Sequence, residues 1–306
     1  MSDAPLQAQR PWTRTFAWLV RRELWEHPAV WIAPVAAAGF AALVHFLTAL
    51  GVSDAERARS LAGPSHPFMG PYVAASLSVL VIGLLVGVLY CLEALQGERR
   101  DRSLLFWKSM PVSDRLTVLS KFVVPAVLIP LVCLVAIVAA NIVMLGMQSL
   151  AWLGRSQDPA LLWAQLDLPF LWIGLVYALP FVMLWYAPVW AWVLLVSAWA
   201  RRMVQLWALA PLLAVLVVEH TAFSTTGFHW AAERWLAGGI LHPFSHPPAV
   251  THAHGHTLPP PVTWITSLSE LDPLRLYTLP QLWIGVLIAA LLLALTVRLR
   301  RSRVPL

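Results

Sequence analysis

Residues Phe122–Met147 read FVVPAVLIPLVCLVAIVAANIVMLGM, a stretch without a single charged side chain. A helix of this length measures about 39 Å at about 1.5 Å per residue, which is enough to cross a hydrocarbon core of about 30 Å. Five other stretches are long and apolar enough to cross, or nearly so: Ala29–Leu50, Pro71–Leu92, Leu168–Ala200, Met203–Val218 and Leu279–Val297. The sequence therefore predicts an all-α integral membrane protein with six transmembrane helices, in which residues 1–306 form a single transmembrane domain.

The composition agrees with this fold class. Hydrophobic residues make up 59% of the chain, charged residues only 12%, and the mean hydropathy is +0.71. These values exclude an ordinary soluble domain. The two cysteines, Cys91 and Cys133, both lie in apolar runs and supply neither a disulfide framework nor metal-ligand spacing.

Lys and Arg are distributed unequally between the loops. Basic loops stay cytoplasmic, so with the amino terminus inside, both termini are expected in the cytosol. In that orientation 16 of the 21 basic residues are cytosolic, and only Arg57, Arg59, Arg155, Arg234 and Arg275 lie outside. Topology and contact with anionic lipid account for the isoelectric point of about 9.9 without nucleic acid as a partner.

Two of the predicted spans are irregular. Leu168–Ala200 would measure roughly 50 Å as one helix and contains three prolines, so we expect it to tilt, kink or project beyond the bilayer. Met203–Val218 is only about 24 Å long, short for a simple crossing. The external loop that follows, residues 219–278, begins with a largely apolar stretch, and we expect re-entrant helices there between the fifth and sixth spans.

The segment Pro11–His27 has the pattern of an interfacial helix on the cytoplasmic surface. Arg14 and Arg21 lie on one side, Glu23 interrupts the apolar face, and the apolar side carries Trp12, Phe16, Leu19, Val20 and Leu24. A basic leader that only fixes the topology is an equal alternative.

The loop Gln96–Lys121 lies between the second and third spans. It has a charged start at residues 98–102, an apolar centre at residues 104–107 and a proline stop at Pro111. This pattern predicts a short interfacial helix that docks a soluble partner. The alternative is a loop that lies on the headgroups, with its aromatic residues in the interface and its arginines on anionic lipid.

The arrangement resembles the permease subunits of type-2 ATP-binding-cassette (ABC) exporters. The resemblance consists of an amphipathic elbow helix, six spans, a coupling helix between the second and third spans, and re-entrant helices between the fifth and sixth. Its most specific local match is Glu98-Arg99-Arg100-Asp101, Ser103, Leu104-Leu105, Pro111 and Lys121, although the family's usual glycine between the acidic cluster and the apolar pair is missing. The resemblance implies two permease copies, identical or closely related, and two copies of an ATPase subunit.

The chain lacks the phosphate-cradling loop that ends in Gly-Lys-Ser or Gly-Lys-Thr. Any ATP-driven activity therefore needs a separate ATPase polypeptide. ATP and Mg²⁺ would bind there, this chain would bind no cofactor, and it would not itself be an enzyme. We expect the docking residues to be Glu98, Arg99, Arg100, Asp101, Arg102, Leu104, Leu105, Phe106, Trp107, Lys108 and Pro111.

The substrate pathway is less clearly marked. Trp185, Trp192 and Trp199 recur every seven residues and so share one helical face. They could stack on an amphiphilic substrate, but packing against lipid or a neighbouring helix is the favoured interpretation. His45 and Asn141 lie inside spans, where they mark either a cavity or one interhelical hydrogen bond each.

The external loop carries a proline-rich, histidine-rich stretch in which His252, His254 and His256 could chelate one transition-metal ion. A solvated loop without metal is the favoured interpretation, because the spacing suits a flexible chelator and no acidic residue lies between Ile240 and Ser269. A metal-handling membrane protein remains an alternative function, as does a membrane anchor for a larger complex.

The expected function is thus export of a lipid, peptide or hydrophobic drug by alternating access. The arginine- and alanine-rich composition fits the inner membrane of a bacterium with a GC-rich genome.

Overall fold

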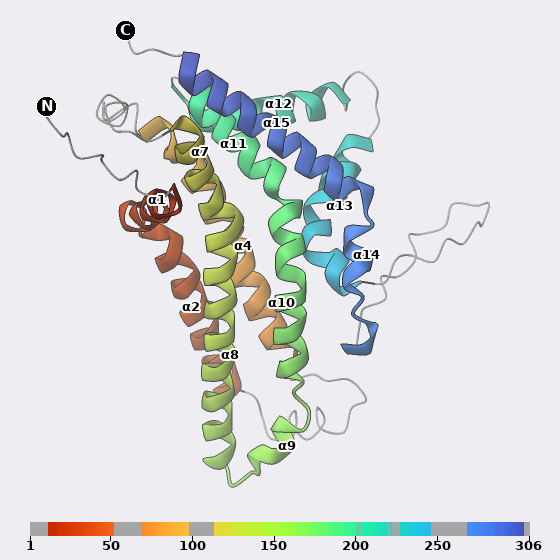
Figure 1. The fold of residues 1–306 in the computed structure, drawn as a ribbon. Coiled ribbons are helices and arrows are strands. Elements are labelled where there is room, and N and C mark those ends of the chain that lie inside the picture. Colours follow the sequence, from red (N-terminus) through yellow and green to blue (C-terminus); the bar gives the residue numbers. More distant parts are fainter. Residues whose placement is uncertain are drawn as a thin grey trace, which may run out of the picture.

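The computed structural model describes residues 12–51, 69–97, 113–200, 202–219, 221, 227–245 and 268–302. In these residues the chain is a bundle of α-helices, shown in Figure 1. Five stretches are long and apolar enough to cross a membrane: Ala29–Gly51, Met69–Ala94, Asp114–Leu153, Pro159–Trp185 and Pro280–Ser302. The protein is therefore a multi-pass helical membrane protein with five candidate spans, and five of the six predicted spans are confirmed as long apolar helices.

The first two spans, α2 (Ala29–Gly51) and α4 (Met69–Ala94), pack against each other and against the third. The third is one 40-residue helical stretch made of α7 (Asp114–Val123), a π-helical turn (Val124–Leu128) and α8 (Ile129–Leu153). Pro125 and Pro130 each lack a backbone N–H, and a wider turn is the usual way in which a long helix accommodates such missing donors.

The fourth predicted span is a broken helix. After the short α9 (Pro159–Trp163), α10 (Leu168–Trp185) is followed by α11 (Ala187–Trp199), with Tyr186 between them. Pro188 has no N–H to donate to the carbonyl of the preceding turn, which explains the break at this place. Of the outcomes expected for this overlong stretch, the structure therefore shows a kink.

The predicted fifth span, 203–218, is the shorter helix α12 (Val204–Val218). It lies across the end of the bundle where α1 and the last turns of the final helix also lie, rather than along the bundle (Figure 1). Its 15 residues span only about 23 Å, less than the hydrocarbon thickness.

The next helix, α13 (Gly227–Leu241), runs beside α10 in the opposite direction. Gly239 meets Tyr186 near the end of α10, whereas Phe244, in the 3₁₀ turn that follows α13, meets Gly174 near its beginning. After a 3₁₀ turn (Leu268–Glu270) and α14 (Pro273–Tyr277), the last span α15 (Pro280–Ser302) packs along α11.

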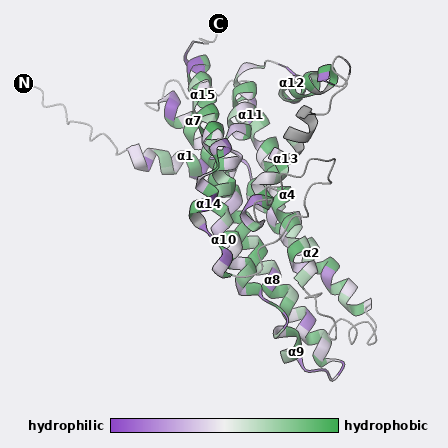
Figure 2. Ribbon diagram, turned by 90° about the vertical axis from the view of Figure 1, so that its right-hand side faces the viewer, coloured by the Kyte–Doolittle hydropathy of each residue, from purple (hydrophilic) through white to green (hydrophobic). Residues whose placement is uncertain are grey.

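The amino-terminal helix α1 (Trp12–Glu26) confirms the predicted helix at 11–27. It lies across the end of α2, seen end-on in Figure 1 and lengthwise in Figure 2. Figure 2 also shows hydrophobic residues along the long helices and hydrophilic ones gathered near α1, α7 and the end of α15. We call this the α1 end of the bundle.

Candidate functional site at the ends of α4 and α7

The predicted docking residues lie outside the described part of the chain. These are Glu98, Arg99, Arg100, Asp101, Arg102, Leu104, Leu105, Phe106, Trp107, Lys108 and Pro111. The structure does describe both flanks of this segment, the end of α4 and the start of α7, and both lie at the α1 end of the bundle.

The carboxyl end of α4 is held by a serine of α11. The Ser197 hydroxyl donates to the Leu92 carbonyl at 2.9 Å and accepts from the amides of Leu95 and Gln96 at 3.3 and 3.2 Å. The last carbonyls of a helix lack partners within it. Here the buried Ser197 hydroxyl donates to one of them and accepts from two amides that follow the helix. The point where the chain leaves α4 is therefore fixed to α11.

The start of α7 is fixed in a similar way. Ser113 is its N-cap, and its hydroxyl accepts from the Leu116 amide at 3.3 Å. Asp114 in the first turn accepts from Arg300 Nε of α15 at 3.0 Å. The segment 98–112 thus leaves and returns at two points that are each bound to another span.

A buried charged cluster joins α1 to these two helices. Glu23 of α1 accepts from Lys121 Nζ of α7 at 2.9 Å and from the Tyr90 hydroxyl of α4 at 2.8 Å. His27 Nε2 lies 3.8 Å from the same carboxylate, and its ring packs edge-on against Tyr90. Glu23 and Lys121 are each only 1% exposed. We call Glu23, His27, Tyr90 and Lys121 the charged cluster.

The geometry gives this cluster a mechanical consequence. Breaking a buried ion pair by removing one partner leaves an uncompensated charge and costs about 3–5 kcal/mol. Separation of α1 from α7 would break the same ion pair and cost a similar free energy. The helices α1, α4 and α7 are therefore held together as one unit at this end.

A second polar cluster, at the opposite end of the same spans, is neutral. Gln148 Oε1 of α8 accepts from the Tyr72 hydroxyl of α4 at 3.0 Å and lies 3.2 Å from His45 Nε2 of α2. All three residues are buried. His45 therefore makes the interhelical hydrogen bond that the sequence allowed for it. We call His45, Tyr72 and Gln148 the neutral cluster.

The three pathway tryptophans contact neighbouring helices. Trp185 is buried and donates to the Trp235 carbonyl of α13 at 2.9 Å. Trp192 donates to the Ala208 carbonyl of α12 at 3.2 Å, and Trp199 packs edge-on against Trp207 with ring centroids 5.0 Å apart. These contacts favour helix packing over substrate binding for all three residues, which is the interpretation that the sequence analysis preferred.

Asn141 of α8 is fully buried, and among the described residues neither its amide nitrogen nor its oxygen has a hydrogen-bond partner. Burial of an unpaired amide at membrane depth is costly. Unlike His45, Asn141 makes no interhelical hydrogen bond within the described residues.

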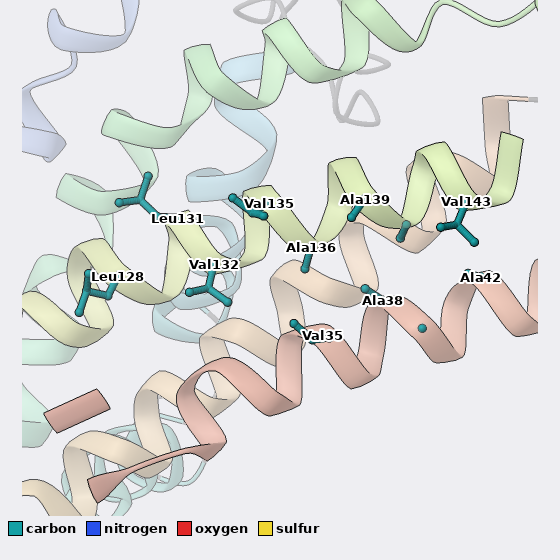
Figure 3. A pocket seen from close by; sticks show the side chains of 12 residues that line it. Val35, Ala38, Ala42, Leu128, Leu131, Val132, Val135, Ala136, Ala139 and Val143 are labelled. Carbon is teal, nitrogen blue, oxygen red and sulfur yellow. The ribbon is translucent and has the colours of Figure 1, made fainter. Parts of the chain in front are cut away.

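One groove among the described residues is lined by apolar residues alone. It lies between α2 and α8 and has a volume of about 520 Å³ (Figure 3). Several small residues line it, among them Ala38, Gly39, Ala42, Ala136 and Ala139. Such a surface offers shape and dispersion contacts to a hydrocarbon chain but no polar group for orientation.

The candidate metal ligands His252, His254 and His256 lie outside the described residues. Within the part of the chain that the structure describes, no group of three His, Cys, Asp or Glu side chains could hold a metal ion.

Comparison with known proteins identifies no family for this chain, since no family model, curated protein or solved structure matches it.

The sequence pattern marked only some residues of the charged and neutral clusters. Glu23 stood out as a break in an apolar face and His45 as a polar residue in a span, but Tyr90, Lys121 and Gln148 carried no signal that linked them to those residues. A buried acid in an amphipathic helix does demand a basic partner, and Lys121 is one of only two lysines in the chain. The need of a buried acid for a basic partner was therefore the one feature of the sequence that could have linked Lys121 to Glu23.

Proposed function

We propose that this chain is the transmembrane permease subunit of an ATP-driven ABC exporter, powered by a separate ATPase subunit. The observation that carries the proposal is the charged cluster, because it ties α1, α4 and α7 together where residues 98–112 leave and return. A docking segment can move spans only if its flanks are firmly joined to them. Ser197 and Arg300 extend the same unit to α11 and α15.

The direction of the helices supports six passages. The contacts place the end of α4, the start of α7, the end of α11 and the end of α15 at the α1 end. A return passage is then needed between α11 and α15. In the proposal α12 and α13, each 15 residues long, supply it together, and α13 runs antiparallel to α10. Six passages leave both termini on one side, the cytosol, and the basic residues near α1, α7 and α15 agree with that orientation.

The working complex would contain two permease copies, identical or closely related, and two ATPase subunits that bind ATP and Mg²⁺. Closure of the ATPases would move the docking segments, and alternating access would carry a hydrophobic or amphiphilic substrate, a lipid, peptide or drug, outward through a bacterial inner membrane. The apolar groove between α2 and α8 suits such a substrate better than an ion.

Co-purification tests the proposal. The tagged full-length chain would be isolated in mild detergent as wild type, with Leu104, Phe106 and Trp107 changed to Asp, and as a matched control with Leu161→Asp and Trp163→Asp. The control residues are exposed apolar side chains on α9, at the opposite end of the bundle. We expect an ATPase subunit to accompany the wild type and the control but not the docking variant.

Absence of an ATPase from all three preparations would overturn the proposal. Equal loss from the control and the docking variant would show that the docking segment has no special role. A bound partner whose retention and activity do not depend on ATP turnover would favour a membrane anchor instead.

A further inference from the structure

The exposed side of α1 carries an alternating pattern of arginine and tryptophan. Arg14, Trp18, Arg21 and Trp25 follow one another at spacings of four, three and four residues. At about 100° per residue, these four positions fall within about 60° of the helix circumference. All four are exposed; Trp18 is 51% and Trp25 71% accessible. We call them the outer face of α1.

The opposite side of α1 is already occupied by protein. Leu19 and Glu23 are buried, and Leu24 packs against the core. The apolar side, which would anchor an isolated amphipathic helix in a membrane, is therefore used against the bundle, chiefly α7. Contact between the middle of α1 and its surroundings is therefore left to its exposed side, which includes the outer face.

The outer face differs from the neighbouring Arg22 in how its charges are paired. Arg22, beside this face, forms a two-pronged pair with Glu26 at 2.6 and 2.8 Å. By contrast, within the described part of the chain neither Arg14 nor Arg21 has a carboxylate partner. The Arg21 guanidinium lies over the Trp25 ring, 4.7 Å from its centroid, an arrangement that holds the cation without cancelling its charge.

The position of α1 indicates where this charge is presented. Only His27 and Pro28 separate α1 from the first span, α2, so the helix lies at the boundary of the hydrocarbon region. Tryptophan is enriched at this boundary, and arginine there meets lipid phosphates. A soluble acidic partner would not require exposed tryptophans at this level.

We propose that the outer face of α1 binds the headgroups of anionic phospholipids at the membrane surface. The two arginines bind the phosphates and the two tryptophans lie between the headgroups and the acyl chains. The inference is independent of the exporter function, because it requires only α1 and a lipid surface.

Lipid titration of the purified full-length protein, followed by native mass spectrometry, tests this. The probes are phosphatidylglycerol and phosphatidylcholine with identical acyl chains. In the R14Q/R21Q variant we expect the affinity for phosphatidylglycerol to fall about fivefold per arginine removed, with the affinity for phosphatidylcholine unchanged. The matched control is R115Q/R202Q, which removes two exposed arginines at the same end but off this face.

An unchanged phosphatidylglycerol affinity in R14Q/R21Q, or an equal fall in the control, would overturn the proposal. R14K/R21K keeps the charge and should keep most of the binding, so it gives a separate test if the glutamine variant does not fold. A loss as large in the lysine variant would contradict the proposed role of charge. Trp18→Leu with Trp25→Leu should weaken binding of both lipids to the same extent.

Discussion

The two ends of α4 are held by clusters of opposite character. Near its start, Tyr72 donates to the neutral amide of Gln148; near its end, Tyr90 donates to the carboxylate of Glu23, which is also paired with Lys121. The two tyrosines are 18 residues apart, about 27 Å along the helix. The polar links of this helix to its neighbours are therefore hydrogen bonds between uncharged side chains near its start, and hydrogen bonds with an ion pair near its end.

The two clusters differ in the free energy that is needed to separate the helices they join. Opening the charged cluster would leave two buried charges without partners, at about 3–5 kcal/mol. Interhelical hydrogen bonds between neutral groups in membrane proteins average only about 0.6 kcal/mol. We therefore expect α2, α4 and α8 to separate more readily at the neutral cluster than α1, α4 and α7 do at the charged cluster. In an alternating-access transporter, this would leave the docking end rigid and the opposite end able to open.

The largest effect is expected from Lys121→Met. The variant removes the ammonium group that pairs with the Glu23 carboxylate at 2.9 Å and leaves that carboxylate buried, so the free energy of unfolding should fall by about 3–5 kcal/mol. Thermal unfolding in detergent would measure it. The double variant Glu23→Gln with Lys121→Met should recover much of this loss, because no charge is then stranded. A purely additive double variant would mean that the two residues are not coupled.

An intermediate effect compares the two tyrosines directly. Tyr90→Phe removes a hydrogen bond to a charged group, worth about 1.5–3 kcal/mol, whereas Tyr72→Phe removes one to a neutral amide, worth about 1 kcal/mol or less. The same unfolding measurement on both variants gives the ranking. Because the substitution is identical and on the same helix, each variant is the control for the other; equal losses would refute the contrast between the clusters.

The smallest effect is expected from Asn141→Leu. Asn141 lies in α8 among buried residues, and neither of its amide atoms has a hydrogen-bond partner in the described part of the chain. Its replacement by an apolar side chain of similar size should leave stability unchanged or raise it by about 1 kcal/mol. Gln148→Leu is the matched control, because it leaves Tyr72 and His45 without their partner and should destabilise. A clear loss of stability in Asn141→Leu would show that the amide is bonded in the folded protein.

The sequence predicted the broad architecture well because a helix must have a minimum number of apolar residues to cross the hydrocarbon core, and such stretches are recognisable in the sequence. Five spans, the helix before the first of them and the break in Leu168–Ala200 followed from apolar length, charge and proline positions. The predicted crossing at 203–218 is the shorter apolar helix α12 in the structure, and its passage through the membrane stays a prediction, since length and composition alone cannot distinguish a short crossing helix from an apolar helix that lies across the bundle. The structure adds the packing of α13 against α10, where Gly238 and Gly239 leave room for the rings of Trp185 and Tyr186.

The membrane class and the charge asymmetry between the loops were determined by the sequence alone, because they depend on composition and on the order of residues. The tertiary structure alone decided which polar residues are partners. Glu23 and Lys121 are 98 residues apart in the chain, and His45 and Gln148 are 103 apart. Their pairing depends on which helices pack side by side and on how each is rotated about its axis. Those two quantities also determine that α1 turns its apolar side inward and its arginines and tryptophans outward.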